Sequence, residues 1–379
     1  MAIAATPIDK YRPALYRRRV MRVLITGHDG YIGRVLAPMV RSRGHEVVGL
    51  DSYLFDGCTL GEDIEAIHGE ARDVRDLAAA DLRGFDAVMH LAALSNDPMG
   101  DLDPTRTFEI NYHASLHIAR LAKEAGVERF VFSSSCSLYG AASPDSSLTE
   151  SAFFNPVTPY GESKVLVEQD VAGLADDDFS PTFLRNATCY GFSPRLRLDL
   201  VVNDLVASAY TTGEILIKSD GTPWRPLVHI EDVARAFIAV LESPREAIHN
   251  EAFNIGRTKE NYQVKDIADI VTSIVSGSWV TYAKDGGPDK RCYRVDFSKA
   301  ETSLPGFEPR WTVEEGVRQL LDAYTRYSLN PVDLLTARFV RLRRIQELLD
   351  QGEVGEDLRW SNGPTRFTSD DDLHPLGQT

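Results

Sequence analysis

Residues 22–33 read RVLITGHDGYIG, and this stretch decides the fold of the chain. The unbroken apolar run at its start is typical of a strand buried on both faces, and residues 34–43 continue with helical spacing. Strand, glycine-rich turn and helix in this order open a parallel α/β unit. The stretch therefore predicts a Rossmann-type doubly wound parallel sheet whose first strand is residues 22–26.

The glycines of this turn suit the binding of a phosphate group. Gly27 permits a sharp turn, Gly30 lets a pyrophosphate approach the backbone, and Gly33 lets the helix pack on the strand. The N-terminus of the helix, with Tyr31 and Ile32, would face the negative charge. We expect all five residues to contact a dinucleotide.

An acid at the end of the second predicted strand, residues 46–50, indicates which dinucleotide. Asp51 stands at the distance beyond the first glycine where dinucleotide-binding folds place an acid on the adenosine ribose. Its carboxylate would accept both ribose hydroxyls and repel a 2′-phosphate, so NAD is expected rather than NADP. A solvated acid at a strand end is the alternative.

Two further units continue the sheet, one with a short strand near residues 66–71 and one with a strand at 87–91. Small residues after the second strand leave room for a cofactor, and an amphipathic helix follows that Asn111 opens or enters. The cofactor contacts predicted here are Asp73, Val74, Leu91, Ala92, Ala93 and Asn111.

Residues 129–164 carry the predicted chemistry. A buried strand at 129–132 runs into a serine run, and after a proline-rich loop come Tyr160 and Lys164. The proline before Tyr160 favours a helix start there, which would place Lys164 one turn on, beside the phenol. A free phenol has a pKa of roughly 10, and an adjacent cation draws it toward working pH. Tyr160 could then exchange a proton with a substrate alcohol whose oxygen is held by Ser135.

The Tyr-x-x-x-Lys spacing is weak by itself, because a chain with 14 tyrosines produces it readily by chance. Its context strengthens the catalytic interpretation, since the pair follows a buried strand with a serine-rich end. A glycine-rich turn also lies upstream.

Composition excludes several classes of protein. A net charge of −15 argues against a nucleic-acid-binding surface, and no apolar run approaches the roughly 20 residues that span a bilayer. Four cysteines without Cys-x-x-Cys spacing indicate neither a disulfide scaffold nor a zinc site, and fit a reducing cytoplasm. His113 and His117 stand four apart, but no third ligand is evident, so no metal site is expected.

Together the motifs resemble the extended short-chain dehydrogenases, in their branch of NAD-dependent nucleotide-sugar epimerases and dehydratases, over roughly residues 21–325. A later segment, Asp220-Gly221 with Arg225 and residues 229–233, is similar to the family's substrate-lobe signature. The resemblance implies that Tyr160 is the base on a sugar hydroxyl and that Lys164 also holds the nicotinamide ribose. It selects Ser135 as the catalytic hydroxyl and implies a cofactor contact for Ser133.

The chain departs from the dehydratases of this family directly after Ser135. Those relatives carry an Asp-Glu pair that shuttles protons during water loss, whereas this chain has Cys136 and Ser137. Neither residue can serve as the acid that expels a hydroxyl, so dehydration is disfavoured. The 3,5-epimerizing relatives place a cysteine at the position of Ser137, so that interpretation weakens too.

The substrate half departs as well. Many relatives have an asparagine at the position of Thr188, and the arginine of their Arg-Pro-Gly turn is missing at residues 286–288. Lys290, Arg291 or Arg294 would have to compensate. Arg225 is the best candidate for a diphosphate clamp, with an ordinary surface arginine as the alternative. The predicted substrate contacts are Ser135, Ser137, Asn186, Thr188, Asn203, Arg225 and Arg291.

The domain organisation is expected to be interleaved. We predict an N-terminal extension without the apolar core of a secretion signal, an NAD-binding Rossmann domain, a smaller α/β lobe for the nucleotide sugar, a C-terminal helical extension and a disordered tail. The N-terminal extension is residues 1–20, and the Rossmann domain is 21–185 with 225–254. The nucleotide-sugar lobe is 186–224 with 255–329. The C-terminal helical extension is 330–362 and the tail is 363–379.

The C-terminal extension has apolar residues at helical spacing among Arg338, Arg341, Arg343 and Arg344. One face should be apolar and the other basic. We expect this helix to pack on the chain's own body or on a neighbouring subunit rather than on a membrane surface.

These observations lead to an NAD-dependent epimerase of a nucleotide-diphosphate sugar, acting at C4 through a transient 4-keto intermediate. A ketoreductase or oxidase of a deoxysugar nucleotide and a non-catalytic dinucleotide sensor are the alternatives. The resemblance implies a homodimer in which helices beginning near Asn111 and Tyr160 of two subunits form a four-helix bundle.

Overall fold

The structure, a computed structural model, describes residues 19–61, 67–95, 103–141, 147–284 and 292–363. Its central element is a parallel sheet of seven strands in the order β11-β7-β5-β4-β1-β2-β3. The strands are β1 (Arg22–Thr26), β2 (Glu46–Asp51), β3 (Gly69–Ala71), β4 (Ala87–His90), β5 (Arg129–Ser135), β7 (Ser180–Asn186) and β11 (Glu251–Ile255). The order reverses between β1 and β4, and ligands of such sheets bind at the carboxyl ends of the strands beside this point. The predicted doubly wound sheet is confirmed.

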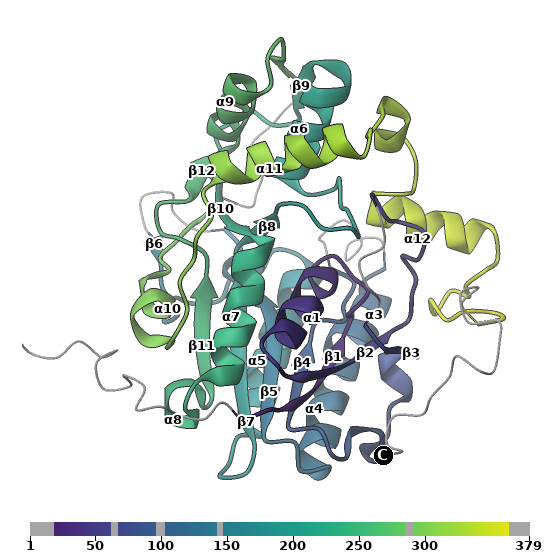
Figure 1. The fold of residues 1–379 in the computed structure, drawn as a ribbon, viewed down its shortest axis with the longest axis vertical. Coiled ribbons are helices and arrows are strands. Elements are labelled where there is room, and N and C mark those ends of the chain that lie inside the picture. Colours follow the sequence, from purple (N-terminus) through teal and green to yellow (C-terminus); the bar gives the residue numbers. More distant parts are fainter. Residues whose placement is uncertain (1–18, 62–66, 96–102, 142–146, 285–291, 364–379) are drawn as a thin grey trace, which may run out of the picture.

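Helices cover both faces of the sheet, which explains why the central strands carry buried apolar residues on both sides. Along β1, Val23 and Ile25 pack on one side with α1 (Gly33–Ser42) and α7 (Ile230–Glu242), and both helices lie in front of the sheet in Figure 1. Leu24 packs on the other side with α4 (Ala114–Glu124) and α5 (Pro159–Ala172).

Two elements of this half extend beyond the residues that the sequence indicates. The strand predicted at 129–132 continues as β5 through the serines to Ser135, because residues 133–135 pair with β7. Asn111, predicted to open or enter a helix, enters one that starts earlier, as α3 (Pro104–Thr107) capped by Asp103, and continues through a π-helical stretch, η4 (Phe108–His113), into α4.

A second, smaller unit lies at the top of Figure 1 and has its own apolar core. It contains a three-stranded sheet in the order β12-β10-β8 and a two-stranded sheet of β13 and β9. Its elements are β8 (Thr188–Tyr190), α6 (Val201–Thr212), β9 (Glu214–Ile217), β10 (Trp224–His229), β12 (Asn261–Gln263), α9 (Val264–Ile274), β13 (Trp279–Tyr282) and α11 (Val313–Arg326). Since β10 pairs within this unit, the chain rejoins the large sheet at α7, later than the predicted residue 225.

Short elements connect these units. They are β6 (Ser147–Leu148), which pairs with β14 (Arg294–Val295), α8 (Arg245–Ile248), α10 (Ser298–Ser303), and the 3₁₀ turns η2 (Val74–Asp76), η3 (Ala79–Leu82), η5 (Cys136–Tyr139) and η6 (Pro331–Leu334).

The C-terminal segment continues from η6 into α12 (Arg341–Asp350) and then runs without further helix to residue 363. Its apolar residues Ile345, Leu348 and Leu358 pack against Leu54 and Leu94 of the large unit. The predicted packing on the chain's own body is therefore confirmed. The predicted basic face is wrong for one residue, because Arg341 is 2% exposed.

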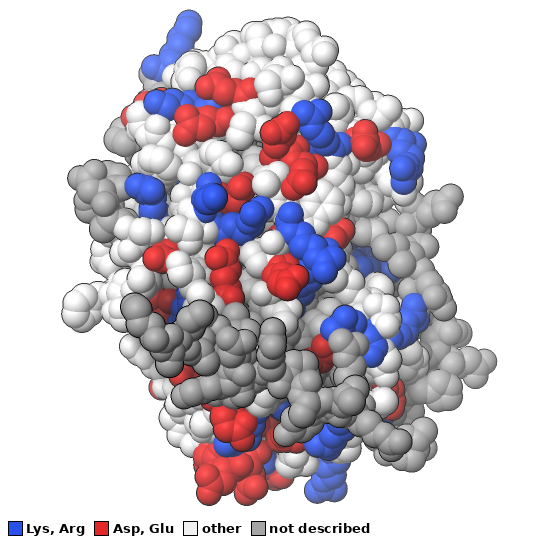
Figure 2. Space-filling view, turned by 60° about the vertical axis from the view of Figure 1, so that its left-hand side comes forward, with Lys and Arg blue, Asp and Glu red and all other residues white. Residues whose placement is uncertain are grey.

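The surface offers neither a membrane span nor, on the face shown in Figure 2, a continuous basic patch. Within the described ranges, no helix is both long and apolar enough to cross a bilayer. On that face, basic and acidic side chains are interspersed.

Candidate active site

A cavity of about 400 Å³ lies beside the carboxyl ends of the central strands. It is lined by the loops that follow β1 and β4, by residues of β2, β5 and α5, by the second unit, and also by residues of the C-terminal segment. Predicted cofactor and substrate residues that line it are Gly27, Gly30, Tyr31, Ile32, Gly33, Asp51, Asp73, Val74, Leu91, Ala92, Ala93, Ser133, Ser135, Ser137, Tyr160, Lys164, Asn186, Thr188 and Arg225.

The glycine-rich turn has the geometry that its sequence indicates. Gly27 has φ +74°, a left-handed conformation that other residues rarely adopt, and its N–H donates to Leu50 O at 2.7 Å. A Cβ at Gly33 would lie 2.3 Å from Gly27 O, closer than real side chains approach. The turn thus needs glycine at both positions, and the start of α1 borders the cavity as a phosphate site requires.

Two arginines fix this turn through Asp29, a buried acid within it. Asp29 pairs with Arg34 at 2.7 Å and with Arg195 at 2.5 Å, and Arg195 Nε also donates to Asp29 O at 3.0 Å. Arg195 lies in the loop between β8 and α6 of the second unit, so the two units are joined at the glycine-rich turn.

Asp51 lies at the end of β2 and lines the cavity. Its carboxylate accepts hydrogen bonds from the N–H groups of Asp29 and Tyr53, at 3.0 and 2.9 Å. A carboxylate has about four acceptor sites, so capacity remains for ribose hydroxyls. Burial, assisted by the charge of Asp29, raises the pKa of Asp51 to about 6.

Asp73 is engaged by a neighbouring arginine. Its side chain accepts from the N–H and the guanidinium of Arg75, with Nη2 at 2.6 Å. Burial alone would raise the pKa of Asp73, but these hydrogen bonds outweigh it and hold the pKa below its ordinary value. Asp73 therefore remains an anion at this end of the cavity.

Tyr160 and Lys164 lie one turn apart at the start of α5. The helix is capped by Thr158, whose hydroxyl accepts from Gly161 N–H at 3.2 Å. Lys164 Nζ lies 5.6 Å from the centroid of the Tyr160 ring and donates to Ser133 O at 2.8 Å. Burial lowers the pKa of Lys164 to about 7, against the opposing charge of Glu168. Its ammonium form is thus fully populated only below neutral pH.

The serines at the end of β5 divide between two environments. Ser135 Oγ donates to Ser137 Oγ at 3.0 Å, and both residues line the cavity. Ser134 donates instead to Glu168, which is paired with Arg185. Ser133 and Ser134 also line the cavity, and Ser135 and Ser137 are the two serines that the sequence assigned to the substrate.

Cys136 is buried away from the cavity lining. Its thiol donates to Arg185 O at 3.2 Å, and burial raises its pKa. It is therefore not available as an acid in the cavity.

Two predicted contact residues stand behind the cavity wall. Asn111 is fully buried, accepting from Leu94 N–H at 2.7 Å and donating to Leu94 O at 3.0 Å. Asn203 is also fully buried, and its amide accepts from Gly191 N–H and donates to Arg197 O, both at 3.0 Å. Both hold cavity-lining loops rather than line the cavity themselves. The predicted Arg291 and its alternative Lys290 lie outside the described residues.

Several cavity-lining residues have no predicted site role, among them Arg197, Asp199, Arg341 and Leu358. Arg197 and Asp199 pair with each other at 2.7 Å. Arg195, Arg197 and Asp199 alternate along one loop, and this spacing of charged residues is the sequence feature that could have indicated them. Arg341 and Leu358 come from a segment with no motif, so only the fold reveals them.

Comparisons with known proteins agree with this geometry. The profile of the "NAD dependent epimerase/dehydratase family" matches residues 23–256. UDP-glucose 4-epimerase from Lactobacillus helveticus is 30% identical over 312 residues, covering 76% of this chain and 92% of that protein.

Solved structures give the same picture. MoeE5 in complex with UDP-glucuronic acid and NAD aligns with TM-score 0.70 at 28% identity, covering 81% of this chain and 100% of MoeE5. TunA, described as an NAD-dependent NDP-hexosamine 5,6-dehydratase, aligns with TM-score 0.70 at 25% identity, covering 81% and 98%.

The turn that a Cβ would fill and the cavity-lining acid Asp51 fit a bound dinucleotide, and both lie within the matched residues. The chain belongs to the NAD-dependent epimerase/dehydratase family, with NAD as its cofactor.

Proposed function

We propose that the protein is an NAD-dependent epimerase that inverts C4 of a nucleotide-diphosphate sugar through a transient 4-keto intermediate. The observation that supports this proposal is one cavity shared by the Tyr160–Lys164 pair, the hydroxyls of Ser135 and Ser137 and the glycine-rich turn. Similarity to a known enzyme also supports the proposal, since a UDP-glucose 4-epimerase aligns with about three quarters of the chain.

In the proposed reaction, Tyr160 takes the proton from the C4 hydroxyl and later returns it to the same oxygen. Lys164 stabilises the phenolate and positions the cofactor ribose, and Ser135 holds the reacting oxygen. Bound NAD⁺ supplies the acceptor, and then the donor, of the C4 hydride. Return of the hydride to the other face of the keto sugar would invert C4, and the cofactor would be regenerated in each cycle.

The region after Ser135 favours epimerisation over dehydration. Loss of water needs an acid beside the leaving hydroxyl, but position 136 is a buried thiol and position 137 a serine. Asp199 lines the cavity, but it is paired with Arg197. These features keep the reaction at the carbinol carbon.

Arg225 is proposed to hold the sugar-nucleotide diphosphate, together with contacts from Asn186, Thr188 and Ser137. All four line the cavity, and Arg225 lies on β10 of the second unit. A guanidinium suits a diphosphate because its planar donors match phosphate oxygens.

The test is incubation of the purified protein with NAD⁺ and a panel of nucleotide sugars, with separation of products and parallel measurement of reduced cofactor. The proposal expects a C4 epimer and no net change in reduced cofactor. Stoichiometric reduced cofactor would instead establish a ketoreductase or oxidase. Binding of NAD without any product across the panel would favour a dinucleotide sensor.

The proposal extends to a homodimer formed through the helices near Asn111 and Tyr160. Light scattering of the purified protein should give twice the mass of the chain, and a monomer mass would refute the dimer.

A further inference from the structure

Arg341, the first residue of α12, lies beyond the residues that match the family. Its guanidinium carbon lies 4.2 Å from the centroid of the Phe55 ring, and the residue is 2% exposed. Nη2 donates to Arg195 O at 3.2 Å, whereas Nη1 is buried without a hydrogen-bond partner. Arg341 nevertheless lines the cavity, so a ligand there could supply the missing acceptor.

The charges around Arg341 are unbalanced. Arg195 pairs with Asp29, and Arg197 pairs with Asp199. Among the described residues, no carboxylate lies within ion-pairing distance of Arg341. Burial, with the nearby charge of Arg197, lowers its pKa to about 10, so it remains a cation at neutral pH. A buried cation with an unsatisfied donor is unfavourable until an anion pairs with it.

The contacts of Arg341 lead to the dinucleotide turn. Its partner Arg195 binds the turn through Asp29, and Phe55 beneath it belongs to the loop that follows Asp51. Arg225, the candidate for the sugar-nucleotide diphosphate, comes instead from β10. The position of Arg341 therefore favours the pyrophosphate of the dinucleotide.

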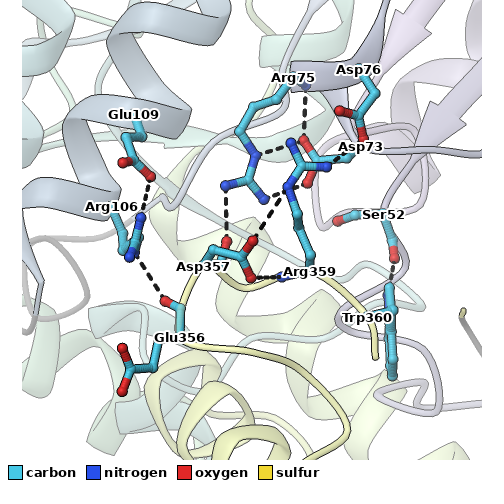
Figure 3. A network of polar contacts seen from close by, with 10 residues as sticks. All are labelled: Ser52, Asp73, Arg75, Asp76, Arg106, Glu109, Glu356, Asp357, Arg359 and Trp360. Carbon is cyan, nitrogen blue, oxygen red and sulfur yellow. Dashed lines mark hydrogen bonds and ion pairs between the residues drawn. The ribbon is translucent and has the colours of Figure 1, made fainter. Parts of the chain in front are cut away.

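The segment that carries Arg341 is fastened again at its far end, as Figure 3 shows. Arg106 donates to Glu356 O at 3.0 Å, Arg75 donates to Asp357 O at 2.9 Å, and Arg359 pairs with Asp76.

The same end is held at the loop after β2, where Trp360 Nε1 donates to Ser52 O at 2.6 Å. Within this anchored end, Leu358 also lines the cavity. The C-terminal segment therefore lies along the cofactor side of the cavity.

We propose that Arg341 binds the pyrophosphate of the dinucleotide, so that residues 341–360 form the outer wall of the cofactor site. This inference rests on NAD as the cofactor and not on which sugar reaction follows. A sugar nucleotide carries a diphosphate too, and the experiment separates these two sources.

The experiment compares ADP-ribose and adenosine binding to full-length wild-type and Arg341→Gln proteins by calorimetry. Only ADP-ribose carries the pyrophosphate, so the substitution should weaken its binding about 10- to 100-fold and leave adenosine binding unchanged. Arg341→Lys should recover part of the loss. Arg343→Gln is the matched control, because Arg343 lies exposed on the same helix.

Thermal unfolding separates this role from a structural one. The Arg341→Gln protein should unfold, without ligand, at or above the wild-type temperature, and its stabilisation by NAD should shrink. The proposal would be overturned if Arg341→Gln lost the same amount of affinity for ADP-ribose and for adenosine. It would also be overturned if Arg341→Gln bound ADP-ribose as tightly as the wild-type protein does. UDP is also titrated onto the NAD-saturated wild-type and Arg341→Gln proteins. If the substitution weakened the binding of UDP and left the binding of ADP-ribose unchanged, the assignment to the dinucleotide would be overturned.

Discussion

The cavity has two walls of different origin. One is built from the family-matched residues, with the glycine-rich turn, the serines of β5 and the start of α5. The other is the C-terminal segment, which contributes Arg341 and Leu358. The first wall is encoded by local motifs whose spacing fixes the geometry. The second depends on packing between segments far apart in the sequence. We propose that the first wall performs the chemistry and holds the cofactor at the glycine-rich turn, and that the second wall adds a further contact to the cofactor.

The largest effect should come from the first wall. Tyr160→Phe removes the proton-transferring oxygen and keeps the ring, so turnover should fall about 10²- to 10⁴-fold while NAD affinity stays unchanged. Turnover is measured with the nucleotide sugar that the wild-type protein converts, and NAD affinity is measured by calorimetry. Full activity in this variant would show that the base is another residue. It would then contradict the proposal that the first wall performs the chemistry through Tyr160.

The next effect concerns the turn itself. Gly33→Ala places a Cβ 2.3 Å from Gly27 O, so the turn must distort, weakening NAD binding at least about tenfold and destabilising the protein by about 1–3 kcal/mol. Gly173→Ala is the matched control, because the nearest atom to its Cβ, Asp170 O, is at 3.4 Å. Denaturant titration and NAD calorimetry measure both changes. Equal behaviour of the two variants would contradict the tight geometry of the turn.

A smaller effect distinguishes the walls by pH. The pKa of Asp51 is raised to about 6 in the folded protein, so the carboxylate is ionised above pH 6 and takes up a proton below it. NAD affinity should therefore fall about fivefold between pH 7 and pH 5, since a charged acceptor binds ribose hydroxyls more strongly. Asp51→Asn should bind NAD more weakly, without this pH dependence. Arg341 stays charged throughout this range, so Arg341→Gln should leave the pH dependence intact.

The smallest effect should appear at the far end of the second wall. Trp360→Ala removes the hydrogen bond to Ser52 O, so NAD should dissociate about two- to fivefold faster while the chemical step is unchanged. Stopped-flow displacement of NAD measures the rate. Trp279→Ala, at an exposed tryptophan of β13, is the control. An unchanged rate in Trp360→Ala would show that this end of the segment does not retain the cofactor.

Much of the first wall could be predicted from sequence because its signals are local. Glycine is needed where the backbone has positive φ or where another backbone atom approaches closely. Tyr160 and Lys164 lie side by side because they are four residues apart on one helix. Asn111 and Asn203 show where such reasoning fails. Both were expected to contact ligands, but their amides bind backbone groups of neighbouring loops, which only tertiary structure reveals.

Arg341 shows the same limit in the second wall. Helical spacing placed it among basic residues facing solvent, but packing of Ile345 and Leu348 on the large unit turns it inward. The burial of a charged residue cannot be predicted from periodicity when its surroundings come from distant segments.

The most direct test of the central claim follows the hydrogen at C4. UDP-glucose or UDP-glucuronic acid deuterated at C4 is incubated with the NAD-loaded protein in ordinary water, and the products are separated and analysed by mass spectrometry. The account predicts a C4 epimer that retains its deuterium, with no accumulation of reduced cofactor. A product whose label has exchanged with solvent, or one reduced nicotinamide formed per sugar converted, would contradict it.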